Sequence, residues 1–95
     1  MDLNAYRQRI DEIDDGILRL FAERMELAAG IAAYKRENDL PVLDRRRERE
    51  KLRKIEEKTP EELQDYAVRL YSLLFELSRS YQNRLLGTQV GEGRE

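Results

Sequence analysis

The stretch from residue 3 to residue 38, LNAYRQRIDEIDDGILRLFAERMELAAGIAAYKREN, decides the fold of this 95-residue chain. Apolar side chains recur in it at intervals of three, four or seven residues, the spacing of one face of an α-helix. This stripe comprises Leu3, Tyr6, Ile10, Ile13, Ile17, Leu20, Leu27, Ile31 and Tyr34. About 35 residues at a rise of 1.5 Å make a rod of roughly 50 Å, longer than a compact domain of this chain length is wide. We therefore predict one long helix, part of which packs on another chain.

Two more helices are predicted after this one. Pro41 disfavours helix immediately before it, and Asp44 can cap a second helix that runs to about Lys58. The segment Thr59-Pro60-Glu61-Glu62 has the pattern of a capping box with proline at the first helical position, and Gly87 is the expected end of the third helix. The apolar stripe between them comprises Leu63, Ala67, Leu70, Leu74, Leu77, Tyr81 and Leu85. Because no strand pattern appears, the predicted fold class is all-α with three helices.

The length of the chain allows one domain and barely encloses a core, so oligomerisation is expected. We expect the domain to span residues 1–86. Residues 87–95 contain three of the five glycines and show no periodicity, which predicts a flexible tail or a severed linker.

Charge and composition exclude several classes of function. Lys+Arg 18 nearly balance Asp+Glu 20, and no apolar run approaches the roughly 20 residues that span a bilayer. The basic run at residues 45–49 is interrupted by Glu48 and lacks an aromatic stacking platform. We therefore expect a cytoplasmic protein that binds neither nucleic acid nor membranes. The chain has no Cys and no His, which removes disulfides, thiolate nucleophiles and the commonest acid–base group at neutral pH.

Polar side chains lie on helix faces that otherwise carry apolar ones. Heptad counting places Arg24 in the stripe of the first helix, and Lys35, eleven residues later, lies about 20° around the same face. In the third helix, Ser78 and Gln82 stand four residues apart beside apolar neighbours. Each of these two helices thus turns polar groups toward the interior.

The second helix shows the same feature. Glu48, Leu52 and Ile55 follow a four-three spacing, which turns Glu48 and the neighbouring Arg47 toward the core. Burying an unpaired charge costs several kcal/mol, so inward cations need compensation. An anionic ligand would supply it, and the simpler alternatives are internal ion pairs or side chains that extend to the edge of the interface.

Five stretches in this order resemble the AroQ class of chorismate mutases, over nearly the whole chain from Tyr6 to about Asn83. The most specific is PVLDRRRE at residues 41–48, which is similar to the loop-to-helix signature of that family. The others are YRQRIDEID at 6–14, AERMELA at 22–28, AYK at 33–35 and ELSRSYQ at 76–82. The connection between the second and third helices, Lys58-Thr59-Pro60, is shorter than in the family.

The resemblance implies an isomerase that converts dianionic chorismate to prephenate in the synthesis of phenylalanine and tyrosine, with no metal and no cofactor. It implies that Arg24 and Ser78 bind one substrate carboxylate. Arg7 and Lys35 would bind the other carboxylate, and Arg47 would support the carboxylate end.

The remaining roles concern the ring and the breaking bond. The resemblance implies that Glu48 and the backbone of Asp44 hold the ring hydroxyl, and that Lys35 and Gln82 donate hydrogen bonds to the ether oxygen. The residues expected to act on the chemistry are therefore Lys35, Gln82, Glu48 and Arg24.

The family fold also implies an intertwined homodimer with two sites. Arg7 and Arg24 lie 17 residues apart, about 25 Å along one helix, so a rigid helix cannot aim both at one small ligand. Arg7 would then serve the site of the partner. Domains of this kind also occur fused to, or associated with, another enzyme of the aromatic pathway. Two alternatives remain from the sequence, an isochorismate-pyruvate lyase of the same fold and a non-catalytic helical regulatory or oligomerisation module.

Overall fold

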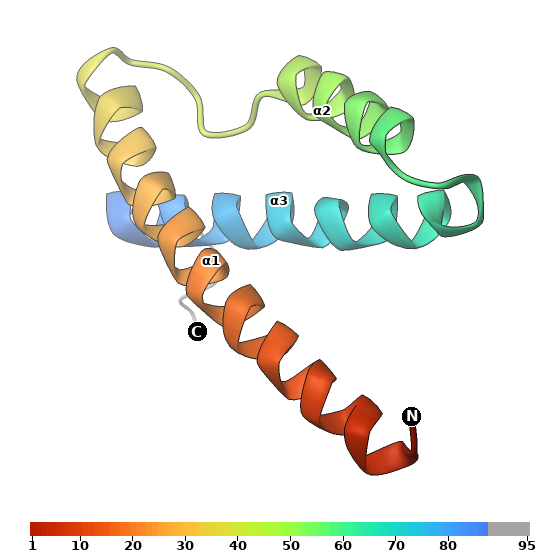
Figure 1. Cartoon of the computed structure of the whole chain (residues 1–95). Helices are drawn as coiled ribbons and strands as arrows, with labels where there is room; N and C mark the ends of the chain where they lie inside the picture. Colours follow the sequence, from red (N-terminus) through yellow and green to blue (C-terminus); the bar gives the residue numbers. More distant parts are fainter. Residues whose placement is uncertain (88–95) are drawn as a thin grey trace.

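The computed structural model describes residues 1–87, which form three α-helices and one short 3₁₀ helix, with no strand among them (Figure 1). The elements are α1 (Leu3–Glu37), α2 (Arg45–Lys58), η1 (Glu61–Leu63) and α3 (Gln64–Leu86). The predicted all-α class is confirmed. Residues 88–95, which make up most of the predicted tail, lie outside the described residues.

Helix α1 is a single uninterrupted element of 35 residues, as its apolar spacing predicted. The side chain of Asp2 caps its start by accepting from the backbone nitrogen of Ala5 at 2.9 Å. At the other end the side-chain amide of Asn38 donates to the carbonyl of Tyr34 at 2.8 Å. The principal extents of the molecule are 52 × 27 × 24 Å, so the length of α1 sets its longest dimension.

Helix α3 is the centre of the packing, because both α1 and α2 lie against it (Figure 1). The buried apolar residues are Ala28 and Ala32 of α1, Ile55 of α2 and Phe75 of α3. The small side chains of Ala28 and Ala32, one turn apart, let α3 approach the C-terminal half of α1 closely. The N-terminal half of α1 extends beyond both other helices.

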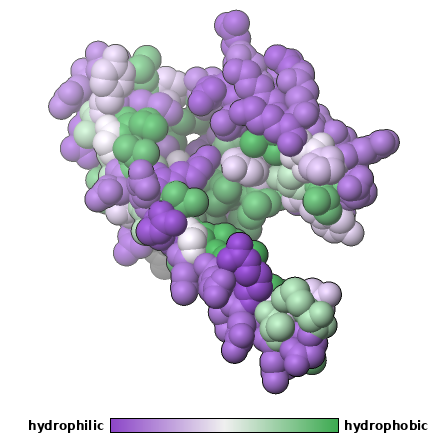
Figure 2. All heavy atoms as spheres, in the orientation of Figure 1, coloured by the Kyte–Doolittle hydropathy of each residue, from purple (hydrophilic) through white to green (hydrophobic). Residues whose placement is uncertain are grey.

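The predicted apolar stripe of α1 is exposed in the single chain. Each of its nine members is between 46% and 62% exposed. The alanines that are buried lie on another face of the helix. Figure 2 shows apolar side chains gathered in the angle between the N-terminal half of α1 and α3. Residues 1–87 contain no further element that could cover a stripe of this length.

The junction between α2 and α3 differs from the prediction. The hydroxyl of Thr59 donates back to the carbonyl of Ile55 at 2.5 Å, so Thr59 ends α2 instead of capping the next helix. Pro60 precedes the single turn of η1 with no side-chain cap, and α3 begins only at Gln64. The predicted capping box is therefore wrong, because Thr59 is the C-cap of α2, while η1 and α3 begin after Pro60 and Leu63 with no side-chain cap.

The end of α3 is as predicted. Gly87 follows the helix in the left-handed conformation with φ 70°, where a side chain would be strained. Within residues 1–87, no helix combines the length and the apolarity needed to cross a membrane.

Candidate active site

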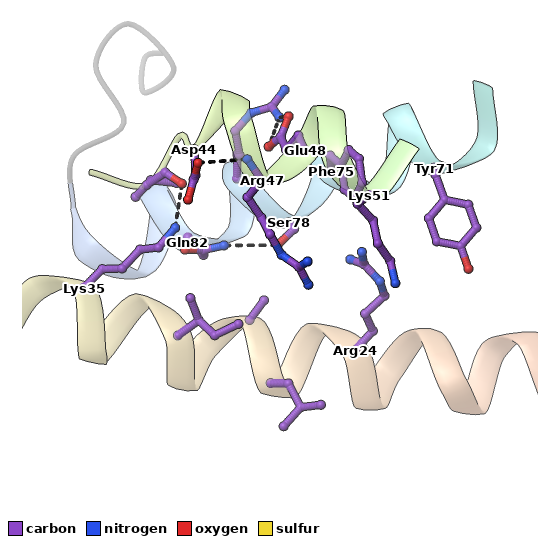
Figure 3. A pocket seen from close by; sticks show the side chains of 15 residues that line it. Arg24, Lys35, Asp44, Arg47, Glu48, Lys51, Tyr71, Phe75, Ser78 and Gln82 are labelled. Carbon is purple, nitrogen blue, oxygen red and sulfur yellow. Dashed lines mark hydrogen bonds and ion pairs between the residues drawn. The ribbon is translucent and has the colours of Figure 1, made fainter. Parts of the chain in front are cut away.

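A pocket of about 400 Å³ lies between the C-terminal half of α1, the start of α2 and the C-terminal half of α3 (Figure 3). This volume is within the range of small-molecule sites. Every site residue predicted from the sequence except Arg7 lines it. These are Arg24, Lys35, Asp44, Arg47, Glu48, Ser78 and Gln82. The packing of α1 and α2 on α3 therefore brings together residues that are up to 58 positions apart.

Helix α1 contributes two cations, as the spacing of Arg24 and Lys35 on one face predicted. The guanidinium of Arg24 lies over the ring of Phe75, 5.9 Å from its centroid, in a cation–π contact. The ammonium of Lys35 donates to the carbonyl of Val42 at 2.7 Å. This bond ties the loop before α2 to α1 and leaves two N–H groups of Lys35 for other acceptors.

The start of α2 is held by Asp44, whose carboxylate accepts from the backbone nitrogen of Arg47 at 3.0 Å. The carbonyl of Asp44 accepts from the backbone nitrogen of Glu48 at 3.1 Å, the first hydrogen bond of the helix. Arg47 and Lys51 follow on one face, one turn apart, and their side chains reach into the pocket toward α1 (Figure 3).

The carboxylate of Glu48 is paired with Arg79 of α3. Nη1 of Arg79 lies 2.6 Å from one carboxylate oxygen and 2.5 Å from the other. The side chains of Arg79 and Glu48 are 31% and 24% exposed, so solvent screens this pair only in part. Glu48 is thus held at the edge of the pocket by a residue that the sequence interpretation did not include.

The polar pair of α3 lies deeper. The side-chain amide nitrogen of Gln82 donates to the hydroxyl of Ser78 at 3.1 Å. Gln82 is only 5% exposed, and its amide oxygen is buried without a hydrogen-bond partner in residues 1–87. Leaving a buried polar atom unpaired costs about 1–3 kcal/mol, which a bound ligand can recover.

The charge of the pocket is strongly positive in a chain whose net charge is −2. Its lining contains five cationic side chains, those of Arg24, Lys35, Arg47, Lys51 and Arg79, against the two carboxylates of Asp44 and Glu48. Of these cations only Arg79 forms an ion pair within the described residues. A small ligand with two carboxylates would complement this lining.

Arg7 is the predicted site residue that the single chain does not bring to the pocket. It lies on the exposed N-terminal half of α1, roughly 25 Å along the axis from Arg24 by the rise of the helix. The prediction that one rigid helix cannot aim both arginines at one ligand agrees with this geometry.

Among the charged and aromatic residues that line the pocket, sequence reasoning missed four, Lys51, Tyr71, Phe75 and Arg79. For Lys51 a signal was available, because it stands four residues after Arg47 and therefore on the same helical face. Tyr71 and Phe75 pack edge to face with ring centroids 6.4 Å apart and form the apolar end of the pocket. No local pattern marks Arg79, since its partner is 31 residues away.

Comparison with known proteins agrees with this geometry. The family model described as chorismate mutase type II matches residues 6–83. A chorismate mutase of Methanocaldococcus jannaschii is 33% identical over 88 residues, which cover 88% of this chain and 87% of the relative. A bifunctional chorismate mutase/prephenate dehydratase of Buchnera aphidicola subsp. Schizaphis graminum is 36% identical over 88 residues, 90% of this chain but 23% of the relative. No solved structure matches the chain. The chain, with a match that spans all three of its helices, belongs to the chorismate mutase type II family.

Proposed function

We propose that the protein rearranges chorismate to prephenate in the pocket between its three helices. The observation that carries the proposal is the convergence of unpaired cations with one buried, incompletely paired amide, that of Gln82, in a pocket of small-molecule size. The reaction is an intramolecular pericyclic rearrangement, so it requires no nucleophile and no proton shuttle. Binding, orientation and fixed electrostatics are then sufficient for catalysis.

Binding must first restrict the flexible substrate to its reactive, diaxial conformation. In the proposal Arg24 and Ser78 bind one carboxylate, with Arg47 beside them. An arginine fork can hold a carboxylate through two parallel hydrogen bonds, which fixes its orientation as well as its position. Because Phe75 packs under the Arg24 guanidinium, the fork is already oriented before substrate arrives.

The chemical step places negative charge on the ether oxygen as its bond to carbon breaks. We assign Lys35 and Gln82 as the donors to this oxygen. The Gln82 amide nitrogen carries two N–H groups and donates one of them to the Ser78 hydroxyl oxygen, so the other remains for the ether oxygen while the Ser78 proton stays available for the carboxylate. A donor that binds the transition state more strongly than the substrate accelerates the reaction, typically by about 3–4 kcal/mol for each group.

Glu48 and the backbone of Asp44 are assigned to the ring hydroxyl. The Arg79 guanidinium limits the rotation of the Glu48 carboxylate and so supports its position at the pocket edge. A carboxylate can accept more than one hydrogen bond on each oxygen, so the ion pair leaves acceptor capacity for the hydroxyl.

We further propose that the active form is a homodimer with two shared sites. The support is the exposed apolar stripe of α1, which a second copy of the same helix would cover. In such a dimer the N-terminal half of α1 crosses to the partner, and Arg7 binds the second substrate carboxylate there together with Lys35.

The test of the function is the loss of chorismate ultraviolet absorbance with the full chain, with the product identified as prephenate. The Arg24→Ala chain serves as the matched inactive control. Release of salicylate and pyruvate from isochorismate would instead identify a lyase. If neither substrate is converted by a folded chain, the protein is a non-catalytic helical module and the proposal is wrong.

A further inference from the structure

Lys51 lines the pocket, but the proposed reaction assigns no substrate group to it, and it forms no ion pair within residues 1–87. It enters the pocket from α2, one turn after Arg47, while Arg24 enters from α1 on the opposite side. Figure 3 shows the ends of these three side chains converging in the same part of the pocket, near Phe75.

The three converging cations have no carboxylate partner in residues 1–87. The ion pairs of this part of the chain involve other arginines, and neither Arg24, Arg47 nor Lys51 takes part in one. Lys51 is moreover partly buried, whereas Lys54 and Lys58 farther along the same helix are exposed. Like charges that converge in a partly desolvated pocket repel each other, and a bound anion removes that repulsion.

Neither carboxylate that lines the pocket forms an ion pair with Lys51. Glu48 is paired with Arg79, and Asp44 accepts from the backbone at the start of α2. Lys35 is bonded to the loop carbonyl of Val42. Lys51 is therefore available to an anion that enters the pocket from outside the described residues.

We propose that Lys51 is a substrate-binding residue whose ammonium, together with Arg24, holds one carboxylate of the dianionic substrate. This proposal rests on the proposed function and adds a second cation to the carboxylate end of the site. The two cations come from different helices, α2 and α1, which pack on α3 rather than extensively on each other. The carboxylate thereby joins α1 to α2 across the pocket.

The experiment compares Lys51→Met with Lys54→Met in the full chain. Methionine keeps most of the side-chain length and removes the charge, and Lys54 is an exposed lysine of the same helix. For Lys51→Met we expect KM for chorismate to rise about tenfold, as for loss of a charged hydrogen bond, with kcat changed less than about threefold. Lys51→Arg should return KM to within about threefold of the original, because the positive charge is kept. Lys54→Met should leave both constants unchanged.

The dependence of kcat/KM on ionic strength is a second test, because the loss of a residue that only packs would not change this dependence. The kcat/KM of the unchanged protein should fall as salt increases, because several cations attract a dianion. The fall should be shallower for Lys51→Met and unchanged for Lys54→Met. An unchanged KM and an unchanged salt dependence in Lys51→Met would overturn the proposal.

Equilibrium binding of prephenate, followed by titration calorimetry, separates this proposal from the proposed function. A chain that binds prephenate without converting chorismate would refute the function, while weaker prephenate binding by Lys51→Met would still support the carboxylate contact. If Lys51→Met instead weakens self-association in sedimentation and leaves prephenate affinity unchanged, Lys51 pairs with a carboxylate of a second copy and the proposal is wrong.

Discussion

The side-chain amide of Gln82 donates to the hydroxyl of Ser78 one turn earlier on α3, at 3.1 Å, and its own oxygen is left buried without a partner in residues 1–87. Both residues line the pocket, and a rotation of the amide exchanges its donor and acceptor ends. This relationship makes Gln82 the most direct probe of where the breaking bond lies.

We predict that Gln82→Glu is slow at neutral pH and recovers on acidification. The ionised carboxylate can only accept and repels the oxygen that gains negative charge, whereas the protonated form donates as the amide does. Burial and the dianionic substrate raise the pKa of the introduced group above the reference of about 4.3, and Lys35 lowers it. We expect the raising effects to dominate with substrate bound, so kcat should titrate at higher pH than kcat/KM.

The control for this experiment is Gln82→Met, which has similar size and no donor at any pH. It should be slow throughout the range and show no recovery in acid. The unchanged protein, which has no histidine, should be nearly flat across neutrality. Original rates and a flat profile for Gln82→Glu would show that the residue does not touch the ether oxygen.

Glu48→Ala tests the carboxylate at the pocket edge. We expect kcat/KM to fall about 10- to 100-fold, the range for loss of a hydrogen bond to a charged group. Helix content measured by circular dichroism should change little, because the side chain is partly exposed. Glu50→Ala is the matched control, since Glu50 lies on the same helix in an ion pair with Arg46 and does not line the pocket. An unchanged kcat/KM in Glu48→Ala would remove this carboxylate from the site.

Subunit mixing tests the shared site. Arg7→Ala and Arg24→Ala should each be inactive alone, since each removes one carboxylate contact from every site. Mixed dimers should contain one intact site and one site that has lost both arginines. Random exchange makes half of the dimers mixed, so the mixture should regain about a quarter of the original activity by subunit counting. No recovery after exchange verified by mass spectrometry would refute the donation of Arg7 across the interface.

Self-association follows from the exposed stripe of α1. Sedimentation equilibrium should show a dimer at micromolar concentration, because covering an exposed apolar stripe of this length is stabilising. Ile13→Asp, which introduces a charge in the stripe, should shift the equilibrium toward a less helical monomer. Gln8→Asp introduces the same charge off the stripe and should not. A folded monomer of the original chain under these conditions would contradict the dimer.

Helix boundaries are the part of the fold that the sequence predicted best. Asp44 and Gly87 act through backbone groups within a few residues of themselves, so local chemistry decides where α2 begins and α3 ends. The same holds for Arg24 and Lys35, whose shared face follows from helical periodicity alone. The role of Thr59 was predicted wrongly because its hydroxyl can bond to either of two neighbouring helices, and it donates to Ile55 at the end of α2.

What the sequence by itself determined is therefore the three helices, the face on which each carries its charges and, by resemblance, the family. Only the tertiary structure decided which charges meet. Glu48 pairs with Arg79, and Lys51 converges on Arg24, in each case between different helices. Both relationships depend on how α1 and α2 pack on α3. The physical reason is that helical hydrogen bonds and caps act over three or four residues, whereas ion pairing and pocket formation depend on distances set by packing between helices.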